Sequence, residues 1–244
     1  MSEAAGDQAA HRDPFVLVHG AGHGGWCWVR VARLLRAAGH EVFTPTLTGL
    51  GERAHLLTED VGPATMVQDI VAVLENEELR DVVLVGHSFG ALVALGVADR
   101  VPHRLRRIVL LDGLVVEPGA SGFDGVPPDV IEERVASAKA SPTGLAFGPS
   151  PATVFGLSDP DDLAWVDRRL TPHPLRSYTE SFGLRDPLGK GVPITYIRCT
   201  DPPFHTLLAG QAIARREGWE WREIATGHDA MITAPEATAA ELLR

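Results

Sequence analysis

Short apolar runs rich in β-branched residues return along the chain, with stretches of helical pattern between them. The runs cover residues 15–18, 41–43, 82–85, 108–111 and 194–197, and a last one covers 219–221 with Ile224. This alternation is typical of a parallel sheet, because two parallel strands are joined by a long crossover, usually a helix. The runs at 82–85 and 108–111 are apolar without interruption, which indicates central strands covered by helices on both faces. The sequence therefore predicts an α/β fold with a mostly parallel central sheet flanked by helices.

Helical patterns accompany these runs, at residues 28–38, 65–76, 89–99, 204–216 and 235–243. Residues 115–191 depart from the rhythm, because they are rich in proline and glycine and contain helical pieces near 129–139 and 161–170 but no convincing strand. A structureless loop of that length is uncommon in a compact domain. We therefore predict an inserted helical lid at about 115–191, over the carboxyl edge of the sheet, where open α/β folds bind ligands.

The length of 244 residues suits one domain with this insertion, and we assign the domain to residues 14–244. Residues 1–13 are polar and alanine-rich and lack the basic and apolar segments of an export signal. We expect them to form a flexible tail and expect the protein to be cytoplasmic.

The charge balance and the cysteine content exclude several classes of partner. The formal net charge is −10 and the chain has only two lysines, which leaves no basic surface for nucleic acid or anionic membranes. No apolar run approaches the roughly 18 residues needed to span a bilayer. Cys27 and Cys199 are the only cysteines and lack metal-binding spacing, so we expect neither a disulfide framework nor a metal site.

The most specific motif follows the run at 82–85 and precedes an apolar helical stretch. It reads GHSFG over residues 86–90, which is Gly-x-Ser-x-Gly in a strand, turn and helix context. In this context the serine sits on a sharp, strained turn that lifts its hydroxyl above the sheet, and the glycines allow close approach of the backbone. The helix that follows favours negative charge at its start. We therefore predict that Ser88 is a nucleophile.

A nucleophilic serine needs a base that accepts its proton. The sequence TGHD at residues 226–229 lies just after the last expected strand, late in the chain, where this chain order places the base. His228 is therefore the predicted general base. The other histidines lie in the tail, in loops or beside glycine turns, and His205, near the predicted lid, has no assigned role.

Two aspartates compete for the role of the acid that orients the histidine. The customary position follows the strand at 194–197 and falls here on Pro202, with Asp201 one residue early. A shift of one residue along an extended chain turns a side chain to the other face, so we expect Asp201 to point away. Asp112 ends the strand at 108–111, at the same carboxyl edge as the serine. We prefer Asp112 and keep Asp201 as the alternative, because such constellations are recognised by geometry rather than by position.

A glycine-rich loop follows the first run. It satisfies Gly-x-Gly-x-x-Gly through Gly20, Gly22 and Gly25. The same spacing marks dinucleotide-binding folds, but these place an acidic residue at the end of the second strand, and residues 42–46 contain no carboxylate. We therefore expect no cofactor. In a hydrolase the loop instead supplies the N–H of Ala21, which joins the N–H of Phe89 as an oxyanion hole.

Further motifs accompany these residues. They read HGAGHGGW at 19–26, AGHEV at 38–42, LDG at 111–113, RLTPHP at 169–174 and AMITAP at 230–235. Together with GHS at 86–88 and GH at 227–228, they resemble the methylesterase and hydroxynitrile lyase family of α/β hydrolases, and its bacterial branch in particular. The resemblance implies the α/β-hydrolase fold and the roles given above for Ser88, His228, Ala21 and Phe89. Its bacterial members often carry a strand-end aspartate that matches Asp112.

The lyase branch of this family has threonine at the position of Gly20 and lysine at the position of Asp229. Both lyase marks are missing from this chain. The departure of Pro202 from the pattern of the plant members puts the common acid position in doubt. The resemblance therefore implies an esterase, and it leaves the choice between the two aspartates open.

We therefore predict a serine hydrolase that cleaves a carboxylic ester, a small hydrophobic methyl ester or lactone, through an acyl-enzyme. The residues expected to line the substrate pocket are Gly20, His23, Trp26, His87 and Trp165. Other aromatic residues that could contribute are Trp28, Phe89, Phe147, Phe155 and Phe182. Two other functions stay open, because fold alone does not decide function: a biosynthetic lyase or cyclase, and a small-molecule receptor that turns over slowly. A homodimer is a further prediction.

Overall fold

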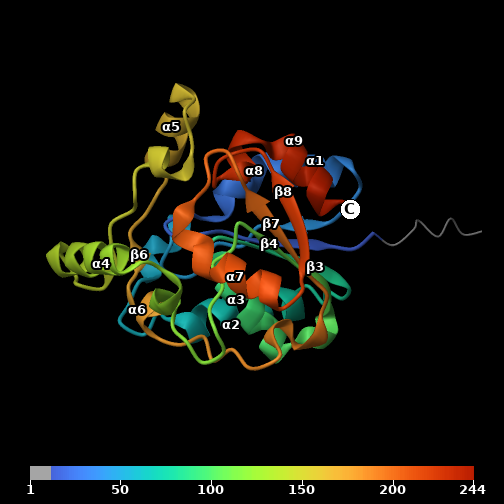
Figure 1. Cartoon of the computed structure of the whole chain (residues 1–244), viewed down its shortest axis with the longest axis horizontal. Helices are drawn as coiled ribbons and strands as arrows, with labels where there is room; N and C mark the ends of the chain where they lie inside the picture. Colours follow the sequence, from blue (N-terminus) through green and yellow to red (C-terminus); the bar gives the residue numbers. More distant parts are fainter. Residues whose placement is uncertain (1–11) are drawn as a thin grey trace, which may run out of the picture.

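The computed structural model describes residues 12–244 and contains a central six-stranded sheet (Figure 1). The predicted tail at residues 1–13 lies almost wholly outside the described residues. The strands are β1 (Phe15–Val18), β2 (Val42–Phe43), β3 (Val82–His87), β4 (Leu105–Leu111), β7 (Ile194–Cys199) and β8 (Glu220–Ile224). They lie in the order β2-β1-β3-β4-β7-β8, and every neighbouring pair is parallel. The predicted α/β fold is confirmed.

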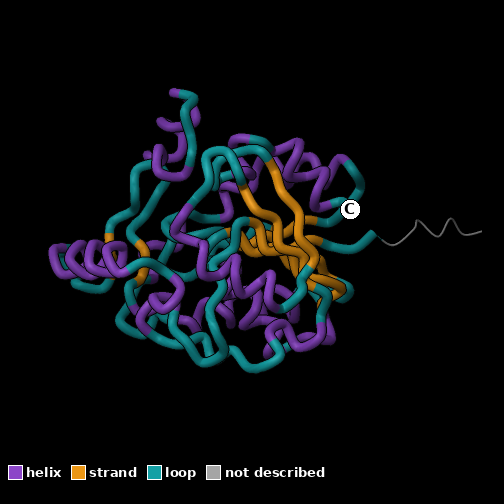
Figure 2. Tube along the Cα trace, viewed as in Figure 1, coloured by secondary structure: helices purple, strands orange, loops and turns teal. Residues whose placement is uncertain are grey.

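Helices cover both faces of this sheet (Figure 1). One face carries α1 (Val29–Ala37), α8 (Ala230–Thr233) and α9 (Pro235–Leu242). The other face carries α2 (Pro63–Asn76), α3 (Gly90–Arg100) and α7 (Leu208–Arg216). Figure 2 shows the strands gathered between these two layers of helices. The predicted helix at 204–216 begins with the short 3-10 turn His205–Leu207 and becomes α-helical at Leu208.

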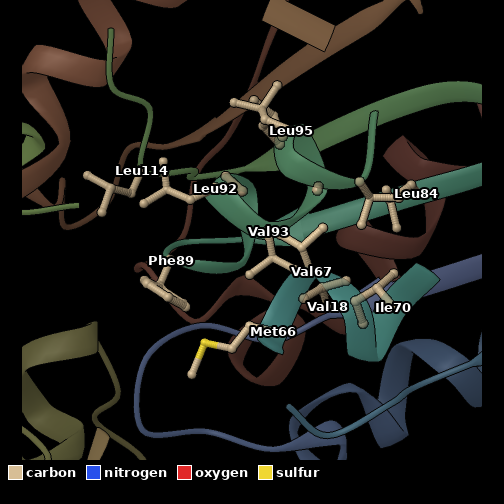
Figure 3. Packing of buried hydrophobic residues seen from close by; sticks show 14 of the residues in the cluster. Val18, Met66, Val67, Ile70, Leu84, Phe89, Leu92, Val93, Leu95 and Leu114 are labelled. Atoms are coloured by element: carbon tan, nitrogen blue, oxygen red, sulfur yellow. The ribbon is translucent and has the colours of Figure 1, made fainter. Parts of the chain in front are cut away.

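Two apolar clusters form the core because alternate side chains of a strand point to opposite faces of the sheet. Val83 and Val85 of β3 pack in the cluster beneath α1 and α9. Leu84 points the other way, toward Val67 of α2 and Val93 of α3 (Figure 3). Strands that are buried on both faces need apolar residues at every position, which explains the uninterrupted run in the sequence.

The segment between β4 and β7 contains helices that project from the edge of the molecule (Figure 1). These are α4 (Pro128–Ala140) and α5 (Pro160–Asp167), whereas the short α6 (Arg176–Thr179) of the same segment lies against the body near α2. No strand was expected here, but β5 (Ala146–Phe147) pairs antiparallel with β6 (His173–Pro174). Each of these strands has two residues, which is too short for a periodic signal in the sequence.

Short 3-10 helices complete the chain, at Gly25–Trp28, Gly51–Leu56, Pro102–Arg104, Gly122–Gly125, Ala152–Phe155 and Leu188–Gly191. No helix in the described part of the chain combines the length and the apolar character needed to cross a membrane.

Candidate active site

Ser88 lies in the tight turn between β3 and α3, with a φ of 51°. A positive φ is strained for a residue with a side chain and is frequent at functional sites. A Cβ atom at Gly86 would lie 2.5 Å from the carbonyl oxygen of Gly90, and one at Gly90 would lie 2.7 Å from that of Val18. Both flanking positions therefore require glycine, and the half-buried serine is held at the carboxyl edge of the sheet.

His228 follows β8 and reaches the carboxylate of Asp112, which follows β4. The distance between His228 Nδ1 and Asp112 Oδ2 is 2.6 Å, and both side chains are buried. The other carboxylate oxygen, Oδ1, accepts the N–H of Cys199 at 3.2 Å. Asp112 itself has a φ of 42°, so two neighbouring strands both end in a strained residue at this edge. With Nδ1 bound to the carboxylate, Nε2 of His228 is the ring atom left to accept a proton.

Asp201, the alternative acid, lies elsewhere. It follows β7 as an exposed residue, and its N–H donates to the carbonyl oxygen of Thr226 at 3.0 Å. The structure thus brings Asp112 together with His228 and leaves Asp201 at the surface.

The glycine-rich loop after β1 approaches the serine turn closely. A Cβ atom at Gly20 would lie 3.0 Å from Cβ of Ser88 and 2.9 Å from Nδ1 of His87, so a larger residue there would displace these side chains. Ala21 comes next and borders the same cavity as Ser88. The ring of Phe89 is packed in the core, while its N–H lies at the start of α3 (Figure 3). The hydrogen bonds among described residues use neither the Ala21 nor the Phe89 N–H.

A cavity opens over Ser88 and His228. Gly20, His23 and His87 line it as expected. The two predicted tryptophans do not, because Trp26 and Trp165 pack edge to face against each other, with ring centroids 5.0 Å apart. Trp28, one of the additional aromatic candidates, is fully buried in the core.

The insertion supplies cavity residues that the sequence reasoning missed. These are Arg134, Pro149, Ser150, His173 and Tyr178, and Phe204 joins them from the chain after β7. The ring of Phe204 stacks on that of His228 with centroids 4.0 Å apart. The motif RLTPHP pointed to the segment that contains His173, but nothing in the local sequence marked the others.

His173 joins the insertion to the glycine-rich loop. Its Nδ1 accepts the N–H of Gly22 at 3.2 Å, and its Nε2–H donates to Ser177 Oγ at 2.8 Å. Burial lowers the pKa of His173 well below its ordinary value, so the ring is neutral and can accept and donate at once. The N–H of Thr171 also donates to the carbonyl oxygen of Gly22, at 2.9 Å. Both backbone groups of Gly22, its N–H and its carbonyl oxygen, are therefore bound to β6 and the residues just before it.

A buried ion pair lies beneath the cavity. Nε2 of His23 is 3.0 Å from Oδ2 of Asp229, the residue after His228, and its Nδ1–H donates to the carbonyl oxygen of Ala21 at 2.8 Å. Burial alone would lower the pKa of His23, but the carboxylate and these hydrogen bonds raise it. Burial likewise acts to raise the pKa of Asp229, and the charge of His23 lowers it. The pair thus connects the Ala21 loop to the neighbour of His228.

We expect Asp229→Asn to lower the free energy of unfolding by about 3 kcal/mol near pH 6, because a buried cation loses its partner. The raised pKa of His23 stabilises the fold fully below its unfolded value of 6.5 and loses this effect as the pH rises through the folded value. The lowered pKa of Asp229 acts above its unfolded value of 3.8, and its effect is lost as the pH falls through the folded value. The deficit of the variant should therefore shrink at alkaline pH.

Urea unfolding at a series of pH values between about 5 and 9 measures this deficit, with Asp201→Asn as an exposed control. A deficit of equal size at every pH would show that the pair is not ionised.

His87, His228 and Asp229 place potential metal ligands within 4.8 Å of one another. Each of these groups has a protein partner through one atom, whereas Nδ1 of His87 and Oδ1 of Asp229 have no hydrogen-bond partner among the described residues. Nε2 of His87 donates to the carbonyl oxygen of His228 at 3.0 Å, and burial lowers the pKa of His87 well below its ordinary value. The carboxylate of Asp229 balances His23. The arrangement is a hydrogen-bonded support beneath the cavity, and the absence of a metal cofactor stays a prediction.

A parallel sheet that ends in a Gly-x-Ser-x-Gly turn, with a histidine and a carboxylate at other strand ends, is the arrangement of serine hydrolases with the α/β-hydrolase fold. The sequence model of the alpha/beta hydrolase family matches residues 15–241. The chain belongs to this family.

Several of the relatives with assigned names are esterases. A carbendazim-hydrolysing esterase of Nocardioides sp. is 39% identical over 241 residues, which cover 93% of this chain and 97% of that protein. Methyl jasmonate esterase 1 of Vitis vinifera is 27% identical over 175 residues, which cover 66% of this chain and 67% of that protein. An extracellular α/β hydrolase from a Paenibacillus species has the same fold, with a TM-score of 0.82, 24% identity and coverage of 95% of this chain and 98% of the other. The chain is accordingly a carboxylic ester hydrolase.

Proposed function

We propose that the protein hydrolyses a small, mainly apolar carboxylic ester through an acyl-enzyme formed on Ser88. The observation that carries this proposal is the buried His228–Asp112 pair, with a distance of 2.6 Å, in which His228 lines the same cavity as Ser88. A methyl ester is the substrate type that we favour. The methyl jasmonate esterase among its relatives supports this choice by name.

The reaction has two halves. Nε2 of His228 takes the proton of Ser88 Oγ, and the oxygen attacks the ester carbonyl carbon. The N–H groups of Ala21 and Phe89 stabilise the negative oxygen that forms, and the intermediate collapses as His228 gives the proton to the departing alcohol. A water molecule, deprotonated by His228, then attacks the acyl group and releases the carboxylic acid and free Ser88. Asp112 keeps Nδ1 of the imidazole protonated and stabilises its positive form.

We further propose that the insertion at about 115–191 acts as a lid. The cavity over Ser88 has a volume of only about 40 Å³, and Phe147, Pro149 and Ser150 of the insertion form part of its wall. The same three residues also border a second hollow, with a volume of about 250 Å³. Displacement of Pro149 and Ser150, which lie outside the β5–β6 pair, would join the two spaces and admit a substrate.

Gly20 and Asp229 argue against lyase chemistry of the hydroxynitrile type. Threonine at position 20 would bring its Cβ to 2.9 Å from Nδ1 of His87, so the surrounding side chains would have to move. A lysine at position 229 would remove the carboxylate that balances His23. No observation favours a cyclase or a slow receptor over the hydrolase. The small-molecule ester remains the proposed partner, and a cytoplasmic location and a homodimer stay predictions.

A fluorophosphonate probe tests the nucleophile directly, because it forms a covalent bond with a serine that a paired base has activated. We expect mass spectrometry to find the label on Ser88 of the wild type and almost none on His228→Ala. The matched control is His205→Ala, which removes an exposed histidine and should label as the wild type does. Equal labelling of His228→Ala, or label on another serine, would contradict the assignment.

A further inference from the structure

Arg134 is the feature of the cavity that the proposed reaction does not use. It lies on α4 and lines the cavity together with Ser88 and His228. Among the described residues that form this wall, it is the one arginine, and the wall contains no lysine, aspartate or glutamate. Its guanidinium stays positively charged at any pH that the protein encounters. The cavity of a protein with a net charge of −10 therefore contains a permanent cation.

Two aromatic rings hold this cation in place. The guanidinium carbon lies 4.5 Å from the ring centroid of Tyr178 and 5.1 Å from that of Phe147. Such contacts with ring faces attract a cation and fix its plane, but they leave the N–H groups at the edge of the guanidinium unused. Phe147 belongs to β5 and Tyr178 to α6, so three separate elements of the insertion build this arrangement.

The charge has no protein counter-ion in the described part of the chain. No carboxylate oxygen among these residues lies within 4.0 Å of Arg134, whereas Arg30 and Arg216, for example, each have an acidic partner. Its Nη1 atom is buried and has no hydrogen-bond acceptor there. A buried donor without an acceptor is costly, and in a binding cavity the missing acceptor is a group that a ligand can supply.

We propose that Arg134 binds a carboxylate at the far end of the acyl part of the substrate, so that the preferred substrates are monoesters of dicarboxylic acids. This proposal rests on the proposed ester hydrolysis. A planar guanidinium matches a carboxylate with two parallel hydrogen bonds, which are stronger when both partners are charged. The acyl part is the place for this group because a methyl ester has almost nothing on the alcohol side.

The rest of the cavity is consistent with a substrate that is apolar between its two ends. Phe147, Phe155 and Phe204 supply apolar wall in the cavity that Arg134 shares with Ser88 and His228. Ligand sites of this kind combine a mainly apolar surface with a few polar groups that fix orientation. Here the serine turn would bind one end of the acyl chain and the arginine the other.

The first experiment compares substrates on the wild-type protein. Methanol release is measured for the monomethyl esters of dicarboxylic acids with four, five and six carbons, and for methyl alkanoates of matched chain length. We expect kcat/KM for at least one of the charged esters to exceed that of its matched alkanoate by about tenfold or more, the size of one charge-assisted hydrogen bond. Alkanoates preferred at all three lengths would overturn the proposal.

The second experiment removes the cation. Arg134→Met should reduce the ratio of charged to uncharged kcat/KM to about one. Lys139→Met removes an exposed cation from the same helix and should keep the wild-type ratio. Arg134→Lys retains the charge without the planar fork and should give an intermediate ratio, which keeps the test valid if the methionine variant does not fold. An unchanged ratio in either foldable Arg134 variant would overturn the proposal.

The two proposals fail in different ways. Hydrolysis of alkanoates that depends on Ser88 but shows no preference for charged esters would leave the ester hydrolase intact and reject the role of Arg134. If no methyl ester of either series were cleaved while the fluorophosphonate still labelled Ser88, the substrate class would be wrong for both.

Discussion

Replacement of Ser88 by alanine is expected to reduce ester hydrolysis by roughly 10⁴-fold or more while the protein stays folded, because the acyl-enzyme can no longer form. The serine is half-buried at a turn, and alanine has the same backbone requirements at a φ of 51°. Loss of a hydroxyl should therefore change the unfolding temperature little. Methanol release and thermal unfolding, both measured on Ser88→Ala, check the two parts of this expectation.

An exposed serine provides the control, and Ser158→Ala should retain wild-type turnover. If Ser88→Ala hydrolysed esters within a few-fold of the wild-type rate, the nucleophile would have to be another group. A variant that lost both activity and cooperative unfolding would instead assign Ser88 a role in folding.

The second large effect concerns the carboxylate. We expect Asp112→Asn to lower kcat by about 10⁴-fold, because an amide no longer holds Nδ1 of His228 protonated and does not stabilise the imidazolium. Asp201→Asn is the matched control, since it removes an exposed carboxylate from a residue whose N–H binds Thr226, two positions before His228, and should change kcat only a few-fold.

Turnover and urea unfolding are measured on both variants. Collapse of activity in Asp201→Asn with full activity in Asp112→Asn would reverse the assignment of the acid. Equal effects in the two variants would mean that neither aspartate orients the histidine on its own.

The central sheet could be predicted because its strands carry their own signal. Residues 82–85 and 108–111 are apolar at every position, and the structure places both runs at the centre of the sheet under helices on both faces. The pair β5 and β6 was missed. Its two-residue strands are paired through contacts between residues far apart in sequence, Ala146 with Pro174 and Phe147 with His173, and no local pattern encodes such a contact.

The candidate site also contains residues that could be predicted from the sequence and residues that could not. Ser88 and His228 stand in motifs whose spacing follows from backbone geometry, and Asp112 could be preferred because parallel strands end at one edge. Arg134 could not be found, because its position in the cavity depends on how the insertion packs over the sheet. Phe204 could not be found either, because the turn after β7 that brings its ring onto His228 has no local signal. Trp26 and Trp165 were assigned to the pocket for their aromatic character, but they pack against each other beside it.

The two hydrogen bonds made by the backbone of Gly22 fix one part of the insertion, the segment around β6, to the glycine-rich loop. Other parts of the insertion, such as α4, are free to vary in sequence. Because His173 and Thr171 bind the loop that contains Ala21, any shift of β6 would also displace an oxyanion donor. Among the described residues, no hydrogen bond joins the α4 segment with Arg134 to Gly22, and Arg134 contacts the β5–β6 pair through the ring of Phe147. Mutations in α4 can therefore alter which acids the enzyme accepts at little cost to acyl transfer, so substrate range can diverge among relatives by changes in one helix while the chemistry stays the same.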